Sequence, residues 1–329
     1  TAYYDLGNEG TLAYLKPGVT DGARKLHWLQ QGKEPTVASQ LPWKGNFIAL
    51  GPKEERLVFD EGGDLKVLMF KGDYVRSLTI GPGFDRFPYW SPDGEWVYFS
   101  SQRDRVRGIW RIKADFSMNA PELVVSHAGF LSVSSMDSDG SRLYLTGSDA
   151  EGSRSIWTYS LSEPSGAIEP LLNSDQEYSN PSISSDGHWL VYIRFERDAP
   201  QIYVRRLDGS GAVELVSHAS GMGNAARWTS GDKEIVYYSN RGGSQIWSCP
   251  VTFSEEGLAL TLGEPGVLAV LPNSSNNYEI SAVDNRVLVP ASVDDGSGAR
   301  VSEAEESVIQ LIFNWKPPGQ GAASGDSSA

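Results

Sequence analysis

Short runs of alternating hydrophobic and polar residues fill most of the chain, and turns rich in Ser, Pro, Asp and Gly separate them. The plainest case is the turn Trp90–Gly94, which lies between the apolar runs Phe87–Trp90 and Glu95–Phe99. Within such a turn Pro presets φ, Asp bonds its own backbone, and Gly tolerates a positive φ. Runs of this length and alternation predict β-strands, so we expect an all-β protein.

The turns recur with a fixed period. Those that contain Gly94, Gly140, Gly187 and Asp232 follow one another at intervals of 46, 47 and 45 residues. Each repeat holds four short strand patterns, as in the stretch from Phe87 to Val125. A period in the forties filled with four strands is typical of the blades of a β-propeller.

We therefore predict a β-propeller of four-stranded antiparallel blades, with seven blades in one domain over residues 1–316. The expected blades are residues 1–42, 43–84, 85–130, 131–177, 178–222, 223–277 and 278–316. Six blades would result instead if the two terminal units merged into one. The apolar run Val308–Phe313 is expected to close the ring between the last blade and the first. Residues 317–329 are rich in Gly, Ser and Ala and are expected to be disordered.

Aromatic residues recur at equivalent strand positions and are expected to pack blade against blade. These are Trp90, Trp96, Trp110, Trp157, Trp228 and Trp247. Trp43 and Tyr178 lie outside the repeat register, so they are the aromatic residues left as candidates for stacking on a sugar.

Composition excludes several functions. The net charge of −14 argues against nucleic acid, which needs a clustered basic surface. The four His residues lack zinc-site spacing, Cys249 is the single Cys, and no catalytic or phosphate-binding motif occurs. We expect no metal, no cofactor, no catalytic residue and no membrane insertion. Because the chain starts at Thr, we expect a processed chain or an excised module of a larger, membrane-anchored protein.

Candidate binding residues gather at one mouth of the predicted ring. Connections from the rim to the next inner strand and loops between second and third strands both reach this mouth, and loops on a rigid scaffold often carry binding residues. The predicted ligand-binding residues are Asp85, Arg86, Arg103, His127, Asn180, His218, Arg227 and Arg241.

The Trp-Ser-Pro-Asp-Gly turn and its echoes resemble the TolB-like, WD40-like propeller repeats of bacteria, over roughly residues 1–316. The opening residues 10–14 and 25–33 and the closing residues 311–315 resemble the ends of propellers attached to bacterial serine/threonine kinases and winged-helix regulators. That resemblance implies a sensor or protein-binding module, often extracytoplasmic. It favours a periplasmic or extracellular location.

These observations predict a non-catalytic propeller that binds a protein or peptide as a sensor or scaffold. One alternative is a propeller lyase or hydrolase, in which arginines such as Arg86 and Arg227 hold carboxylates and His127 or His218 acts as base. Another is the gating propeller of a prolyl-oligopeptidase-type peptidase.

Overall fold

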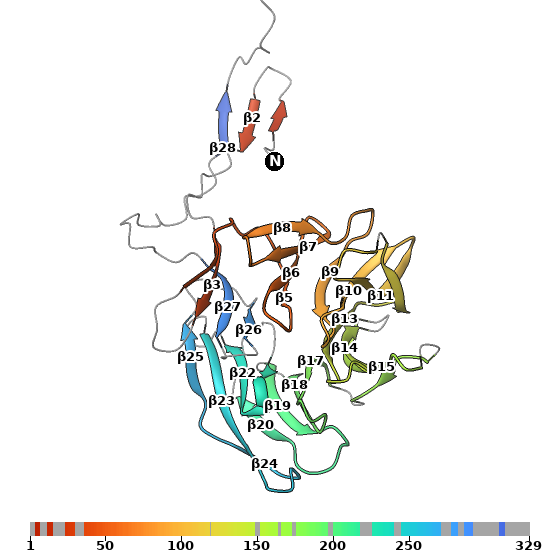
Figure 1. Ribbon diagram of the computed structural model, residues 1–329, viewed down its shortest axis with the longest axis vertical. Helices are drawn as coiled ribbons and strands as arrows, with labels where there is room; N and C mark the ends of the chain where they lie inside the picture. Colours follow the sequence, from red (N-terminus) through yellow and green to blue (C-terminus); the bar gives the residue numbers. More distant parts are fainter. Residues whose placement is uncertain are drawn as a thin grey trace, which may run out of the picture. The chain divides into compact units, whose positions relative to one another are not determined.

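Antiparallel sheets of four or five strands recur around a central space between Arg24 and Val293, as the computed structural model shows (Figure 1). The structure describes residues 24–29, 36–118, 120–148, 152–163, 166–172, 176–196, 200–217, 226–239, 245–270, 278–281 and 286–291 of this unit. It also describes strands at residues 4–6, 12–15 and 309–312. Each sheet is one blade of a propeller.

Within each of the first blades the strands follow one another from the innermost to the outermost. Three of these blades are β5 (Ile48–Leu50), β6 (Arg56–Glu61), β7 (Asp64–Met69) and β8 (Tyr74–Ser77); β9 (Arg86–Trp90), β10 (Trp96–Arg103), β11 (Val106–Lys113) and β12 (Glu122–Ser126); and β13 (Leu131–Met136), β14 (Arg142–Ser148), β15 (Arg154–Ser160) and β16 (Glu169–Pro170).

Two further blades follow along the chain. They are β17 (Tyr178–Ile183), β18 (Trp189–Phe195), β19 (Pro200–Arg206) and β20 (Glu214–Ser217); and β21 (Arg227–Trp228), β22 (Glu234–Ser239), β23 (Gln245–Phe253) and β25 (Gly266–Val270), with β24 (Leu260–Leu262) on the far end of β23. A short 3-10 helix, Ser230–Asp232, takes the place of the Asp-Gly turn between β21 and β22.

The last blade is built from both ends of the propeller. Its strands are β26 (Glu279–Ile280), β27 (Val287–Ala291), β3 (Lys25–Leu29) and β4 (Thr36–Ser39). Strands β27 and β3 pair over five residues, from Val287 opposite Leu29 to Ala291 opposite Lys25. This pairing closes the ring.

The prediction of seven blades is therefore wrong, because the described residues form six. The units expected at 1–42 and 278–316 supply one blade between them, which is the merger that the sequence left open. The strand patterns at the two ends are real, but a strand pattern does not specify its partner. Strands β27 and β3 close the ring. The expectation that the run Val308–Phe313 closes it is therefore wrong.

A second compact unit contains residues 1–23 and 294–329. Within it β2 (Leu12–Leu15) lies between β1 (Tyr4–Leu6) and β28 (Ile309–Ile312) in an antiparallel sheet. Residues 317–329, expected to be disordered, lie outside the described residues.

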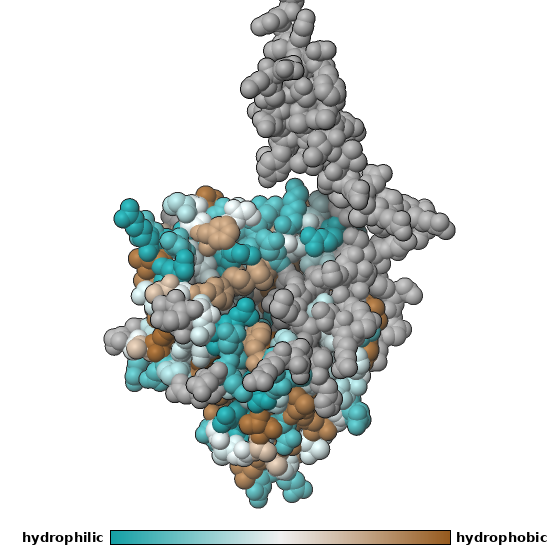
Figure 2. Space-filling view, turned by 180° about the vertical axis from the view of Figure 1, so that it is seen from behind, coloured by the Kyte–Doolittle hydropathy of each residue, from teal (hydrophilic) through white to brown (hydrophobic). Residues whose placement is uncertain are grey.

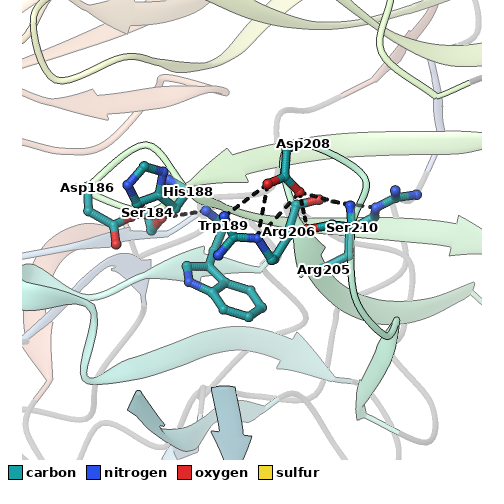
Figure 3. A network of polar contacts seen from close by, with 8 residues as sticks. All are labelled: Ser184, Asp186, His188, Trp189, Arg205, Arg206, Asp208 and Ser210. Carbon is teal, nitrogen blue, oxygen red and sulfur yellow. Dashed lines mark hydrogen bonds and ion pairs between the residues drawn. The ribbon is translucent and has the colours of Figure 1, made fainter. Parts of the chain in front are cut away.

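Two of the tight turns between first and second strands are held by a serine and an aspartate. In the blade that begins with β17, Ser184 Oγ donates to Asp186, and the same Asp186 oxygen accepts the His188 N–H at 2.9 Å (Figure 3). On the neighbouring turn Arg206 binds the Asp208 carboxylate at 2.9 Å, while its guanidinium lies 5.7 Å from the Trp189 ring (Figure 3). The Ser-x-Asp-Gly turn Ser91–Gly94 is held by the same serine and aspartate contacts as Ser184–Gly187.

The core lies between neighbouring blades, in one buried cluster for each junction. Trp90 is an example: it packs with Val58 and Val67 of the preceding blade, and its indole N–H donates to Ala49 O at 2.9 Å. The in-register tryptophans all lie in or against such clusters, as predicted. Figure 2 shows that apolar residues outside the core form small separate groups on a largely hydrophilic face.

The two aromatics set aside for sugar stacking are buried as well. Trp43 is 9% exposed and packs on Phe59 with ring centroids 4.8 Å apart. Tyr178 is also 9% exposed and contacts Tyr192 edge-on at 5.6 Å. The expectation that they could stack on a sugar is wrong, since the connection that carries Trp43 and the inner strand that carries Tyr178 both bury their rings.

Candidate functional site

The first strands of the six blades surround a cavity of about 520 Å³ along the centre of the ring. Its lining comes from all six blades: Phe47–Leu50, Phe87–Pro92, Ser132–Ser134, Asn180–Ser182, Ala226–Arg227 and Glu279. The lining mixes apolar rings with hydroxyls and two charged side chains. Such a mixture can enclose an apolar group and orient it with a few polar contacts.

Two bulges shape one end of this cavity. Phe87 and Asn180 both have a positive φ, 55° and 53°, and each precedes a proline in its inner strand. The strand pairing skips at both places. A β-bulge re-aims a side chain, and a bulky residue such as Phe at positive φ is strained. Strained backbone is common at functional sites. The two bulges therefore make this end of the ring, which we call the mouth, a candidate site.

Around this mouth, aromatic rings surround one arginine. The Arg86 guanidinium lies 5.0 Å from the Phe47 ring, 5.6 Å from Phe84 and 5.2 Å from Phe87. Phe87 in turn contacts Phe130 edge-on at 5.2 Å. Phe84 is 60% exposed and Phe130 38% exposed, so the cluster offers apolar surface to solvent. We call Phe47, Phe84, Arg86, Phe87 and Phe130 the mouth cluster.

A buried carboxylate supports Arg86 from below. Asp60 lies 3.7 Å from the guanidinium and accepts the Phe47 N–H at 2.8 Å and an Asn46 amide hydrogen at 3.1 Å. Burial raises the pKa of Asp60 above its ordinary value, although these hydrogen bonds and Arg86 oppose the rise. Asp60 therefore positions Arg86 without presenting charge to solvent.

The loop that carries Phe84 is fixed by a second buried pair. Asp85 is fully buried and accepts hydrogen bonds from Ser101 Oγ at 2.6 Å and from Arg103. Arg103 itself is only 12% exposed and packs under Gly83. Asp85 and Arg103, predicted to contact a ligand, thus hold the loop in place from beneath.

A second cavity of about 480 Å³ adjoins the mouth between the blades that begin with β13 and β17. Phe87 and Asn180 line both this cavity and the central one. Its other walls include Phe130, Phe195 and Arg154, whose guanidinium lies 5.0 Å from the Phe195 ring. Apolar surface bordered by exposed arginine therefore runs from the ring centre toward its rim.

The remaining predicted residues have different surroundings. His127 Nε2 lies 3.0 Å from Ser148 O, and its ring lies 5.4 Å from Trp157, so local contacts fix it near the rim. Arg227 lines the central cavity. His218 and Arg241 lie outside the described residues.

Arg227 forms an ion pair inside the cavity. Its Nη1 donates to Glu279 Oε2 at 2.7 Å, and 37% of its side-chain surface is open, against 8% for Glu279. Burial raises the pKa of Glu279 above its ordinary value, with Arg227 opposing the rise. Tyr89 lies near both charges, and burial raises its pKa too.

Of the predicted residues, Arg86 lies in the mouth cluster and Asn180 and Arg227 line the central cavity, whereas the phenylalanines of the mouth cluster and Glu279 were not predicted. One available signal was proline inside an inner strand, at Pro88 and Pro181, because proline in a strand marks a bulge or an edge. No local pattern links Glu279 to Arg227, which lies 52 residues earlier. Only the closed ring brings them together.

Comparison with known proteins defines the fold. No known protein-family model matches the chain. A solved structure of a TolB-like protein from Agrobacterium tumefaciens matches 81% of this chain and 96% of its own with a TM-score of 0.61, at 15% identity. The chain has the fold of a TolB-like β-propeller. TolB from Acinetobacter baumannii also matches, with a TM-score of 0.56 and 16% identity over 82% of this chain and 64% of that one.

Other similarities of this chain are shorter or more distant. A 40-residue stretch is 48% identical to an uncharacterized protein of Agrobacterium fabrum, covering 12% of this chain and only 14% of that relative's length. An oligogalacturonate lyase from Vibrio parahaemolyticus matches 89% of this chain and 78% of its own, with a TM-score of 0.50 and 12% identity. Identities this low in the solved structures establish the fold and not the activity.

The described part of the chain meets the requirements neither of a metal site nor of a membrane-crossing helix. Within the residues that the structure describes, no group of three or more His, Cys, Asp or Glu side chains is placed to hold a metal ion. No described helix combines the length and apolar character that crossing a membrane requires.

Proposed function

We propose that this propeller is a non-catalytic module that binds a protein segment at the mouth cluster. The observation that supports it best is exposed aromatic surface around Arg86, on a rigid ring. Aromatic and arginine side chains together are enriched where proteins bind one another. A sensor or scaffold outside the cytoplasm is the role that we infer for such a module.

Charge around the mouth favours an acidic, apolar partner segment. Arg154 is exposed and Arg86 is partly exposed, whereas the carboxylates of Asp60 and Asp85 are buried. The chain as a whole carries a net charge of −14, so these arginines place positive charge at the mouth of an otherwise acidic protein. A segment that carries an aromatic or aliphatic residue next to Asp or Glu would complement it.

The test is selection of peptides from a displayed random library on the immobilised full chain, followed by affinity measurement on single peptides. We expect enrichment of segments that combine an acidic and a large apolar residue. The double variant Phe84→Ala with Phe130→Ala should weaken the selected peptide at least about tenfold, as for hot-spot residues.

A matched control removes equally exposed apolar side chains elsewhere. Val75 is 40% exposed on the outermost strand of its blade, and Leu258 is 59% exposed in the turn before β24. Val75→Ala with Leu258→Ala should leave the affinity within about twofold. Equal losses in both double variants, or turnover of polygalacturonate by the purified chain, would contradict the proposal.

A further inference from the structure

A guanidinium faces the interior of the central cavity. Arg227, Glu279 and Tyr89 each occupy the last but one position of their inner strands, β21, β26 and β9. These positions are equivalent in the repeat, so the three side chains meet at one level of the ring, and each lines the cavity. A cation inside a cavity needs hydrogen-bond acceptors, which come from the protein, from water or from a ligand.

The acceptors around Arg227 are incomplete among the described residues. One nitrogen, Nη1, donates to Glu279 at 2.7 Å, and this is the single hydrogen bond of the guanidinium in that part of the chain. A guanidinium presents five N–H donors in a planar fork that fits a carboxylate with two parallel hydrogen bonds. With 37% of the side chain open, the fork has room for such a second acceptor.

Glu279 holds the arginine and does not fill the cavity. Its side chain is 8% exposed, and besides Arg227 it is hydrogen-bonded to the backbone of Leu50 in the neighbouring blade. Among the hydroxyls of the lining, Ser182 Oγ accepts the Trp228 N–H and keeps its own hydrogen to donate, whereas Ser132 and Ser134 bind Thr146 and Tyr89 binds Ser135 and the Met136 backbone. Arg227 is the cation among the lining residues and Glu279 the carboxylate, so a second carboxylate would find its donors at the Arg227 guanidinium and the Ser182 hydroxyl.

We propose that the central cavity binds a carboxylate group at Arg227, with Glu279 as the positioning residue that fixes the guanidinium. The ligand is either a small free carboxylic acid or the terminal carboxylate of a peptide. Both present the same planar anion, and about 520 Å³ accommodates either. This site lies within the ring and does not depend on a partner at the mouth cluster.

The test is titration of the full-length ¹⁵N-labelled chain with propionate, followed by the NMR signals of arginine side chains, in a low-salt buffer without other carboxylates. Propionamide, which has the same shape without the charge, is the matched neutral probe. We expect propionate to bind and propionamide to bind at least about tenfold more weakly.

Two variants are expected to change the affinity for propionate in opposite directions. Arg227→Gln should weaken propionate binding at least about tenfold, because the bidentate partner is lost. Glu279→Gln should strengthen it about tenfold, because the amide oxygen can still accept from Arg227 and position it, while the negative charge that repels the ligand is removed. Arg86→Gln at the mouth should leave it unchanged. A purely structural ion pair predicts no gain in Glu279→Gln.

The source of the carboxylate is distinguished with Gly-Gly-Phe and its C-terminal amide. Binding of the free peptide at least tenfold tighter than propionate identifies a peptide terminus, and equal binding identifies a small acid. Equal binding of propionate and propionamide overturns the site. So does a Glu279→Gln chain that binds propionate no more tightly than the unaltered chain, and this result decides the question even if Arg227→Gln does not fold. Neither result bears on the mouth cluster.

Discussion

At the scale of single residues, aspartates in the blade turns supply stability that depends on ionisation. Asp93 accepts a hydrogen bond from Ser91 Oγ and another from the Glu95 N–H at 2.8 Å. These contacts, the serine first, lower the pKa of Asp93 below its ordinary value. A carboxyl whose folded pKa is depressed stabilises the fold above its unfolded pKa, near 3.9, and loses that contribution as pH falls through the folded value.

The melting temperature should therefore fall between about pH 5 and about pH 2. Asp93→Asn, which cannot ionise, should show a smaller drop than the unaltered chain when melting is followed by circular dichroism. Asp104→Asn, at an exposed hairpin tip, is the control and should follow the unaltered chain. An unchanged pH profile in Asp93→Asn would show that the turn carboxylate is not the source.

Another residue-scale prediction concerns the loop that presents Phe84. A Cβ at Gly83 would lie 2.8 Å from the Arg103 guanidinium carbon and 2.9 Å from Asp85 Oδ1. Arg103 cannot move aside without weakening its pair with buried Asp85. Gly83→Ala should displace the loop and weaken a selected mouth-binding peptide about fivefold, or about 1 kcal/mol.

Gly266→Ala is the matched control, because a Cβ at Gly266 meets no atom within 4 Å. Affinities of both variants are measured by fluorescence anisotropy on the same labelled peptide. The loop is not part of the binding surface if Gly83→Ala and Gly266→Ala bind alike.

At the scale of strands, stability rests on side chains that link neighbouring blades. Trp90 is 6% exposed, and its packing and indole hydrogen bond both reach the preceding blade. We expect Trp90→Ala to lower the free energy of unfolding by about 3–5 kcal/mol, as for large aromatics removed from packed cores. Leu258→Ala, on an exposed turn, should change it by less than about 0.5 kcal/mol in the same urea titration. Similar losses would mean that the blades do not depend on this junction.

The strands and turns of the middle blades could be predicted because their signals are local. Ser91, Asp93 and Gly94 determine a turn whatever lies far away, and apolar alternation gives each flanking strand a buried face. Partners of terminal strands could not be predicted in the same way: Lys25–Leu29 pairs with a strand more than 250 residues later. The mouth cluster has the same difficulty, since Phe47, Phe87 and Phe130 come from different blades and meet only in the ring.

At the scale of the whole molecule, the ring is complete without the terminal sheet. Strands β27 and β3 close it, while β1, β2 and β28 form their own unit. A chain of residues 24–293 should therefore fold with a melting temperature within a few degrees of the full chain. Truncation before Arg286 removes β27, leaves β3 unpaired on one side, and should cause aggregation. Aggregation of the 24–293 chain would show that closure needs the terminal sheet.

The mouth bearing the bulges at Phe87 and Asn180 is the binding face that we propose. Amide hydrogen exchange of the full chain, with and without a saturating selected peptide, tests this central claim most directly. We predict slowed exchange in residues 78–88 and 178–182, and unchanged exchange in the Asp-Gly turns at residues 91–95, 137–141 and 184–188, at the other end of the inner strands. Slowed exchange in those turns, with the mouth segments unaffected, would contradict it.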